Sequence, residues 1–117
     1  MAKHLKLGKQ AERVAEEYLR RNHYQILDKN YRAGKAEVDI IALDKQTLVF
    51  IEVKSLKKTQ FGYPEEHINT HKTNMLSQAA NQYQIDHNWE KEIRFDTISI
   101  TFLPQAIKLE HFEDAFL

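Results

Sequence analysis

Apolar and polar positions recur along the chain with two different periods, which predict two helices and five strands. Over residues 9–21 the apolar side chains are spaced by three, four, seven and eight, as in an amphipathic helix. A second stripe at helical spacing covers residues 70–85, with Thr70 in the position of a helix cap. Five further stretches have the length and composition of strands: residues 24–32, 36–43, 48–54, 93–102 and 107–112. The order helix, three strands, helix, two strands predicts a single α/β domain over residues 1–117, in which a mixed central sheet of about five strands is flanked by helices.

The strand over residues 48–54 carries charged side chains among apolar ones. Strand side chains alternate between faces, so Phe50, Glu52 and Lys54 share one face and the other is formed by Val and Ile. A strand that begins apolar on both faces is usually central in a covered sheet. Glu52 is therefore expected at the rim of the core, where a carboxylate costs several kcal/mol unless a partner compensates it. Lys54 is one candidate partner, and a divalent metal ion is another.

Composition and charge narrow the class of protein. The chain has no cysteine, no apolar run near the length of about 18 residues that a membrane span needs, and no signal-peptide pattern at residues 1–4. These features predict a cytoplasmic protein without disulfides. The net charge is zero, which argues against a strongly electrostatic nucleic-acid binder. However, residues 1–60 hold 13 Lys/Arg against 8 Asp/Glu, and residues 61–117 hold 4 against 9, so the basic half contains the charged strands.

Asp39, Glu52 and Lys54 together have the composition of a metal-dependent phosphodiester hydrolase site. Mg²⁺ prefers oxygen ligands and is usually held by one or two carboxylates, waters and a substrate phosphate. Asp39 and Glu52 lie on adjacent predicted strands, and Lys54 is placed to orient a water or to stabilise charge on phosphate. A surface ion pair between Glu52 and Lys54, worth about 0–1 kcal/mol, accounts for the spacing equally well. The spacing alone leaves both interpretations open.

Longer segments add a resemblance to a known family. Asp39, a gap of twelve residues and then Glu52-x-Lys54 is similar to the Asp…(Asp/Glu)-x-Lys signature of the restriction-endonuclease-like nucleases. With these strands, further segments spread over nearly the whole chain resemble the small bacterial YraN family, which is grouped with the Holliday-junction-resolvase-like nucleases: residues 8–15, 30–32, 36–42, 61–64, 94–96 and 110–116.

This resemblance implies a restriction-endonuclease-like fold and a Mg²⁺-dependent endonuclease that cuts DNA, in particular branched or structured DNA, through a metal-activated water, with Mn²⁺ able to substitute. Asp39 and Glu52 would be metal ligands, Lys54 the catalytic lysine, and Glu12 an additional carboxylate from the first helix. The position of Glu12 agrees independently, since it lies about 20° around the helix axis from Leu19, on the flank of the buried stripe.

Three lysines are candidate contacts to nucleic-acid phosphates. Lys57 and Lys58 follow the Glu-x-Lys strand, where Leu56 replaces a basic residue often found in the family. Lys72 leads the apolar stripe of the second helix, where a snorkelling lysine is the more common explanation. Glu37 shares a strand face with Asp39 and is either a partner of the metal ligands or a solvated carboxylate.

Other side chains carry weaker signals. The six histidines show no metal-ligand spacing and are expected to be non-catalytic. The alternative to a nuclease is a non-catalytic nucleic-acid-binding or scaffold protein that keeps the nuclease fold. A homodimer is expected by analogy with resolvases, because two sites related by a two-fold axis can act on both strands of a duplex.

Overall fold

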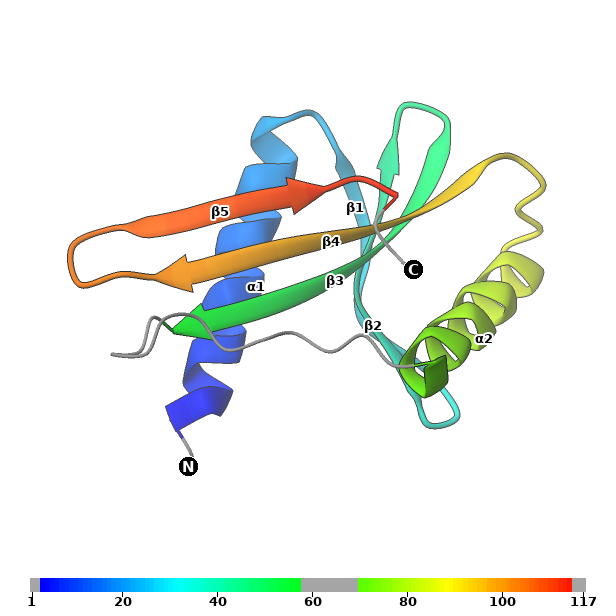
Figure 1. The fold of residues 1–117 in the computed structure, drawn as a ribbon. Helices are drawn as coiled ribbons and strands as arrows, with labels where there is room; N and C mark the ends of the chain where they lie inside the picture. Colours follow the sequence, from blue (N-terminus) through cyan, green and yellow to red (C-terminus); the bar gives the residue numbers. More distant parts are fainter. Residues whose placement is uncertain (1–2, 58–69, 115–117) are drawn as a thin grey trace.

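The helices and strands occur in the order that the hydrophobic pattern predicts. The computed structural model describes residues 3–57 and 70–114 (Figure 1). Its elements are, in chain order, α1 (Lys3–Arg21), β1 (Gln25–Ala33), β2 (Ala36–Asp44), β3 (Thr47–Lys57), α2 (Thr70–Asp86), β4 (Ile93–Phe102) and β5 (Ile107–Phe112).

All five strands form one sheet in the order β1-β2-β3-β4-β5. Neighbouring strands are antiparallel except β3 and β4, which are parallel. A parallel pair needs a long crossover connection, and α2 lies in that connection. The sheet is therefore mixed, and β3 is its central strand, as its apolar faces predict.

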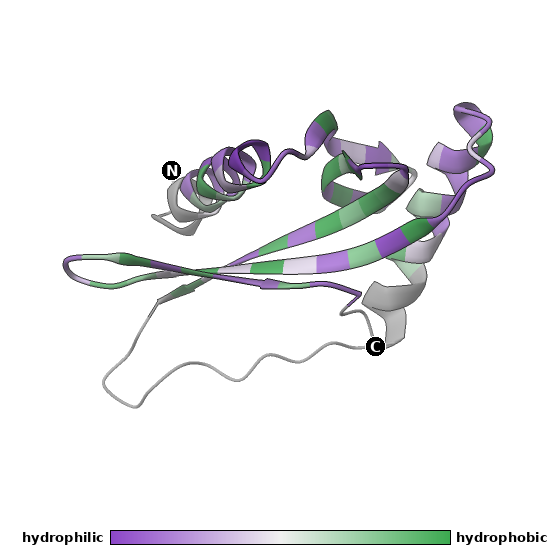
Figure 2. Ribbon diagram, turned by 90° about the horizontal axis from the view of Figure 1, so that it is seen from above, coloured by the Kyte–Doolittle hydropathy of each residue, from purple (hydrophilic) through white to green (hydrophobic). Residues whose placement is uncertain are grey.

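The two helices cover opposite faces of the sheet. On one face, Ala15 and Leu19 of α1 belong to the same buried cluster as Ile51 of β3. On the other face, Tyr83 of α2 packs in a second cluster with Phe50 of β3. Figure 2 shows hydrophobic positions along the central strands, which contribute to both clusters. The predicted division of β3 into two faces is confirmed.

Element ends differ from the expectations at two places. β3 continues through Lys57 and not only to residue 54, where the predicted strand ends, because β4 pairs with residues 55–57 as far as Lys57↔Phe102. α1 begins at Lys3 and not near residue 9, because a helix can extend beyond the apolar stripe that predicts it. No helix in the described residues combines the length and apolarity needed to cross a bilayer.

Two glycines are expected to respond in opposite ways to substitution by alanine. Gly34, in the turn between β1 and β2, has φ +63°, which disfavours a Cβ, so Gly34→Ala should lower the free energy of unfolding by about 1–2 kcal/mol. Gly8 lies inside α1, and a Cβ there meets no atom within 4 Å, so Gly8→Ala should raise it by about 0.5–1 kcal/mol. Urea unfolding followed by circular dichroism measures both. Shifts of the same sign would contradict these backbone assignments.

Candidate active site

The sheet forks at Asp39. The β2–β3 pairing runs from Asp44↔Thr47 to Ile40↔Ile51 and stops one residue short of Asp39. There the Val53 backbone N–H donates to Asp39 Oδ2 at 2.8 Å, so a side chain takes the place of a ladder hydrogen bond. The preceding part of β2 stays paired with β1 alone. Because β2 leaves β3 at this point, a space opens between the β1–β2 hairpin and β3.

A second observation marks the same position. Val38 and Ile41 both belong to the cluster under α2, whereas Ile40 belongs to the cluster under α1. Strict alternation would place Val38 and Ile40 on the same face. The side chains of β2 therefore switch between the two faces of the sheet at Asp39. The Asp39 side chain lies where the regular alternation of the strand is interrupted.

A cavity of about 200 Å³ lies in the fork. The tip of the β1–β2 hairpin, β3 and the early turns of α2 form its walls, through Lys35, Ala36, Glu37, Asp39, Glu52, Met75 and Leu76. Asp39 and Glu52 were expected on adjacent strands, and the structure places both in the lining of this one cavity.

Glu52 is buried, with 7 % of its surface exposed. In the pairing of β3 with β4, Glu52 lies opposite Thr97. Two residues farther along the same face, Lys54 lies opposite Ser99. Thr97 and Ser99 are buried and Lys54 is half-buried, so Glu52 and Lys54 lie on a polar stripe in the interior of the sheet. Lys54 follows Glu52 on one face but is not among the residues that line the cavity.

Glu12 is not among the residues that line the cavity. It is half-buried on α1, and the Asn30 amide nitrogen, turned toward the carboxylates, donates to Glu12 Oε1 at 3.2 Å and Glu37 Oε1 at 3.3 Å. Burial raises the pKa of Glu12, the Asn30 hydrogen bond opposes that shift, and the nearby Glu37 charge adds to it. Glu12 is thus linked to the cavity through Asn30 and Glu37. Within residues 3–57 and 70–114, no three His, Asp or Glu side chains converge as a ready-made metal site, and Glu12 as third ligand stays a prediction.

The predicted phosphate-binding lysines cannot be placed by their side chains. Lys57 ends β3 and Lys72 lies in the first turn of α2, but their side chains lie outside what the structure describes, as does the whole of Lys58. The structure adds Lys35, an exposed residue beside Gly34 that lines the cavity. A basic residue in the turn immediately before the strand that carries Glu37 was the available sequence signal for it.

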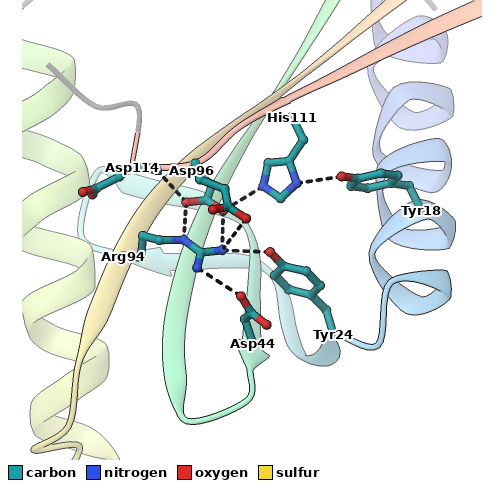
Figure 3. A network of polar contacts seen from close by, with 8 residues as sticks. Tyr18, Tyr24, Asp44, Arg94, Asp96, His111 and Asp114 are labelled. Atoms are coloured by element: carbon teal, nitrogen blue, oxygen red, sulfur yellow. Dashed lines mark hydrogen bonds and ion pairs between the residues drawn. The ribbon is translucent and has the colours of Figure 1, made fainter.

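The opposite face of the sheet carries a buried polar network (Figure 3) that the sequence analysis did not identify. At its centre is Asp96 of β4, fully buried and paired in register with Ile51. The Asp96 carboxylate accepts hydrogen bonds from Arg94 Nε (2.8 Å) and Nη2 (2.9 Å), His111 Nε2 (2.7 Å) and the Asp114 backbone N–H (3.0 Å). Burial alone would raise the pKa of Asp96, but the hydrogen bonds from His111 and Arg94 outweigh it and hold the pKa below its usual value.

Arg94 and His111 extend this network to distant elements. Arg94 also donates to Asp44 Oδ2 at 3.0 Å and to the Tyr24 hydroxyl at 2.8 Å, and the Tyr18 hydroxyl lies 2.9 Å from His111 Nδ1. Burial raises the pKa of Tyr24 to about 12 despite the neighbouring guanidinium. The network joins α1, β2, β4 and β5, and so it fixes the sheet behind the cavity. A charged pair two residues apart in an apolar strand, Arg94 and Asp96, was the sequence signal for it.

The chemistry of the cavity follows from its donors. Asp39 and Glu52 supply carboxylate oxygens, the ligands that divalent cations such as Mg²⁺ prefer, and two carboxylates with waters are a sufficient protein contribution for this ion. Lys35 lines the cavity and Lys54 follows Glu52, so positive charge lies near the carboxylates. This combination suits a cation and a phosphate bound together.

Comparisons with known proteins agree with one another. Residues 11–100 match the family model described as "Uncharacterised protein family UPF0102". A UPF0102 protein from Christiangramia forsetii is 43% identical over 116 residues, covering 99% of this chain and 98% of the relative. A second, from Flavobacterium psychrophilum, is 41% identical over 116 residues with the same coverage of both proteins. A third, from Persephonella marina, is 44% identical over 94 residues, covering 80% of this chain and 81% of the relative. The chain therefore belongs to UPF0102, the YraN family.

Proposed function

We propose that the cavity in the fork is the active site of a Mg²⁺-dependent endonuclease that hydrolyses phosphodiester bonds of DNA, with branched or structured DNA as its substrate. The observation that supports this most directly is the meeting of Asp39 and Glu52 in one cavity. They lie on different strands, and the fork places both at the point where β2 and β3 separate. Because β2 and β3 are not paired beyond the fork, the space between them would be open to a phosphate.

The donor set fits the metal ion that this reaction needs. Asp39 and Glu52 would hold Mg²⁺, and Glu12 would join them if Asn30 released it. When bound, Mg²⁺ supplies positive charge for the scissile phosphate and lowers the pKa of a water molecule that it binds. Mn²⁺ has similar ligand preferences and would substitute for it.

The residues in and beside the cavity have different tasks in this proposal. The Val53 N–H holds Asp39 Oδ2, which fixes the orientation of the carboxylate before any ligand arrives. Lys54 would stabilise negative charge that develops on the phosphate, and Lys35 at the hairpin would contact the DNA backbone. Leu76, which is buried, closes one wall of the cavity and limits the access of bulk water.

A non-catalytic nucleic-acid-binding or scaffold protein is the second candidate. The observation in its favour is that Glu12 does not meet Asp39 and Glu52 directly, so no three-carboxylate site is assembled among the described residues. In that case the basic first half would contact phosphates and the acidic second half a protein partner.

A cleavage assay separates the two candidates. The purified protein is incubated with a four-way junction, a flap and a linear duplex, in Mg²⁺, in Mn²⁺ or in EDTA. We expect cleavage of at least one substrate with either metal ion and none in EDTA, because without a metal ion the negative carboxylates repel the phosphate and no water is activated. DNA binding that falls steeply with salt, is indifferent to metal ions and leads to no cleavage would contradict the nuclease and support the binding protein.

A further inference from the structure

β5 is a regular strand at the edge of the sheet. All six of its residues, Ile107–Phe112, pair with β4 without a shift of register, and none has a positive φ. Ile107 and Phe112 are 52 % and 44 % exposed, and they are two of the four large apolar side chains that are exposed in the described part of the chain. A regular, partly apolar edge offers its free backbone groups to another strand.

The other edge of the sheet, β1, also exposes a large apolar side chain, Leu27, but it differs in the regularity of its pairing and backbone. Its pairing with β2 shifts register between Ile26 and Asp28, and Asn30 has φ 53°. Bulges and polar side chains are the common means by which proteins protect an edge from further pairing. β5 has no bulge and no positive φ within its own length, and its exposed charged side chains, Lys108 and Glu110, are of opposite sign.

The buried network also holds β5 in place (Figure 3). His111 in the strand and the Asp114 N–H just after it both bind the Asp96 carboxylate, and Leu109 packs against the cluster under α1. A strand anchored in this way pays little ordering cost when a partner strand is added, because its backbone is already fixed.

The charge pattern of β5 identifies the partner. Lys108 and Glu110 flank Leu109, and both are exposed, with 3.7 Å between Lys108 Nζ and Glu110 Oε1. If two copies of β5 pair antiparallel about a two-fold axis at Leu109, each Lys108 lies directly opposite Glu110 of the second copy. We propose that the β5 edge pairs with the β5 of a second copy of this chain and forms a two-fold symmetric dimer.

This arrangement bears on the cavity, a step that rests on the proposed nuclease function. An antiparallel two-fold axis is perpendicular to the sheet, so both copies present the same face on the same side of a continuous sheet of ten strands. The two β3 strands are then five strand spacings apart, about 24 Å across the sheet. The dimer would present its two cavities to one DNA molecule, with one cavity for each strand.

Charge reversal tests the dimer without reference to cleavage. Sedimentation velocity over the micromolar range should give the wild type twice the chain mass of 13.8 kDa. Lys108→Glu and Glu110→Lys each place like charges opposite one another twice, and each should weaken dimerisation by about 100-fold. The double variant Lys108→Glu/Glu110→Lys restores every opposite-charge pair and should dimerise like the wild type. An equimolar mixture of the two single variants should form heterodimers for the same reason.

Two results would overturn the proposal. One is a wild type that sediments as a monomer throughout this range. The other is a dimer that both charge reversals leave intact, because its interface must then lie elsewhere. Circular dichroism of each variant verifies folding. Folding should be unchanged, because both substituted side chains are exposed. A confirmed dimer with no cleavage activity would reject the proposed function alone, and an active monomer would reject the dimer alone.

Discussion

Glu52→Gln is expected to reduce the rate of DNA cleavage by at least about 10²–10³-fold, the usual effect of removing one electrostatic group from an active site. Gln has almost the same size and shape as Glu, so the buried position should remain filled. What is lost is the negative charge and the basicity that make a carboxylate a ligand for Mg²⁺, since a neutral amide is a weaker donor. Single-turnover cleavage of the best substrate, compared with wild type, measures the effect.

Asp39→Asn should produce a loss of similar size. The Asn side-chain oxygen can still accept the Val53 N–H bond that Asp39 Oδ2 accepts at 2.8 Å, so the fork should persist. A variant that loses cleavage but unfolds at the wild-type temperature would therefore point to a catalytic role of the carboxylate. Calorimetric titration with Mn²⁺ should show weaker binding to both variants, which gives a readout separate from activity.

Glu37→Gln is the matched control. Glu37 also lines the cavity, but it is exposed and its Oε2 lies 3.0 Å from Arg32 Nη2, so the same change of charge occurs at the rim. The rate of DNA cleavage by the Glu37→Gln variant should stay within a few-fold of the wild-type rate. If all three variants lost activity equally, the cause would be the summed charge of the cavity and not the pair of ligands. Full activity of Glu52→Gln would contradict the proposed site.

Much of the fold and the central pair of the site could be predicted because they depend on local patterns. The period of apolar residues distinguishes helices from strands, and the alternation in β3 correctly separated Phe50 from Ile51. Two consecutive strands joined by a short turn are usually neighbours, so Asp39 and Glu52 could be expected on adjacent strands. The end of β3 was missed because its partner β4 is remote in sequence.

The remaining parts of the site depend on contacts that no local pattern encodes. The fork exists because the Asp39 side chain binds the Val53 backbone, and helical periodicity placed Glu12 on a flank without showing that Asn30 links it to Glu37. The network around Asp96 depends even more on tertiary structure, since most of its side chains come from distant segments of the chain. Sequence spacing therefore found the pair of carboxylates but not the interactions that hold it in place.

Asp96→Ala is expected to lower the free energy of unfolding by about 3–5 kcal/mol, the largest stability effect predicted for the chain. The substitution removes the carboxylate that accepts four hydrogen bonds and leaves the half-buried Arg94 guanidinium with Asp44 and Tyr24 as its close partners. Urea denaturation followed by circular dichroism measures the change, which is a large fraction of the 5–15 kcal/mol typical of a domain. Glu17→Ala is the control, because its ion pair with Arg21 is exposed and long, at 3.8 Å, and should matter little. A loss below about 1 kcal/mol for Asp96→Ala would contradict a central role of the network.

The same carboxylate should make the wild type sensitive to acid. The pKa of Asp96 in the folded protein lies below its ordinary value of 3.8, so the unfolded chain takes up the proton first as the pH falls. The stabilising contribution of Asp96 is therefore complete above that ordinary value and is lost as the pH falls from there through the lowered pKa. In Asp96→Asn this titration is absent, so the difference in unfolding free energy between wild type and variant should shrink as the pH is lowered over this range. A difference that stayed constant from neutral pH to below pH 3.8 would show that packing, and not the charge of Asp96, accounts for its contribution.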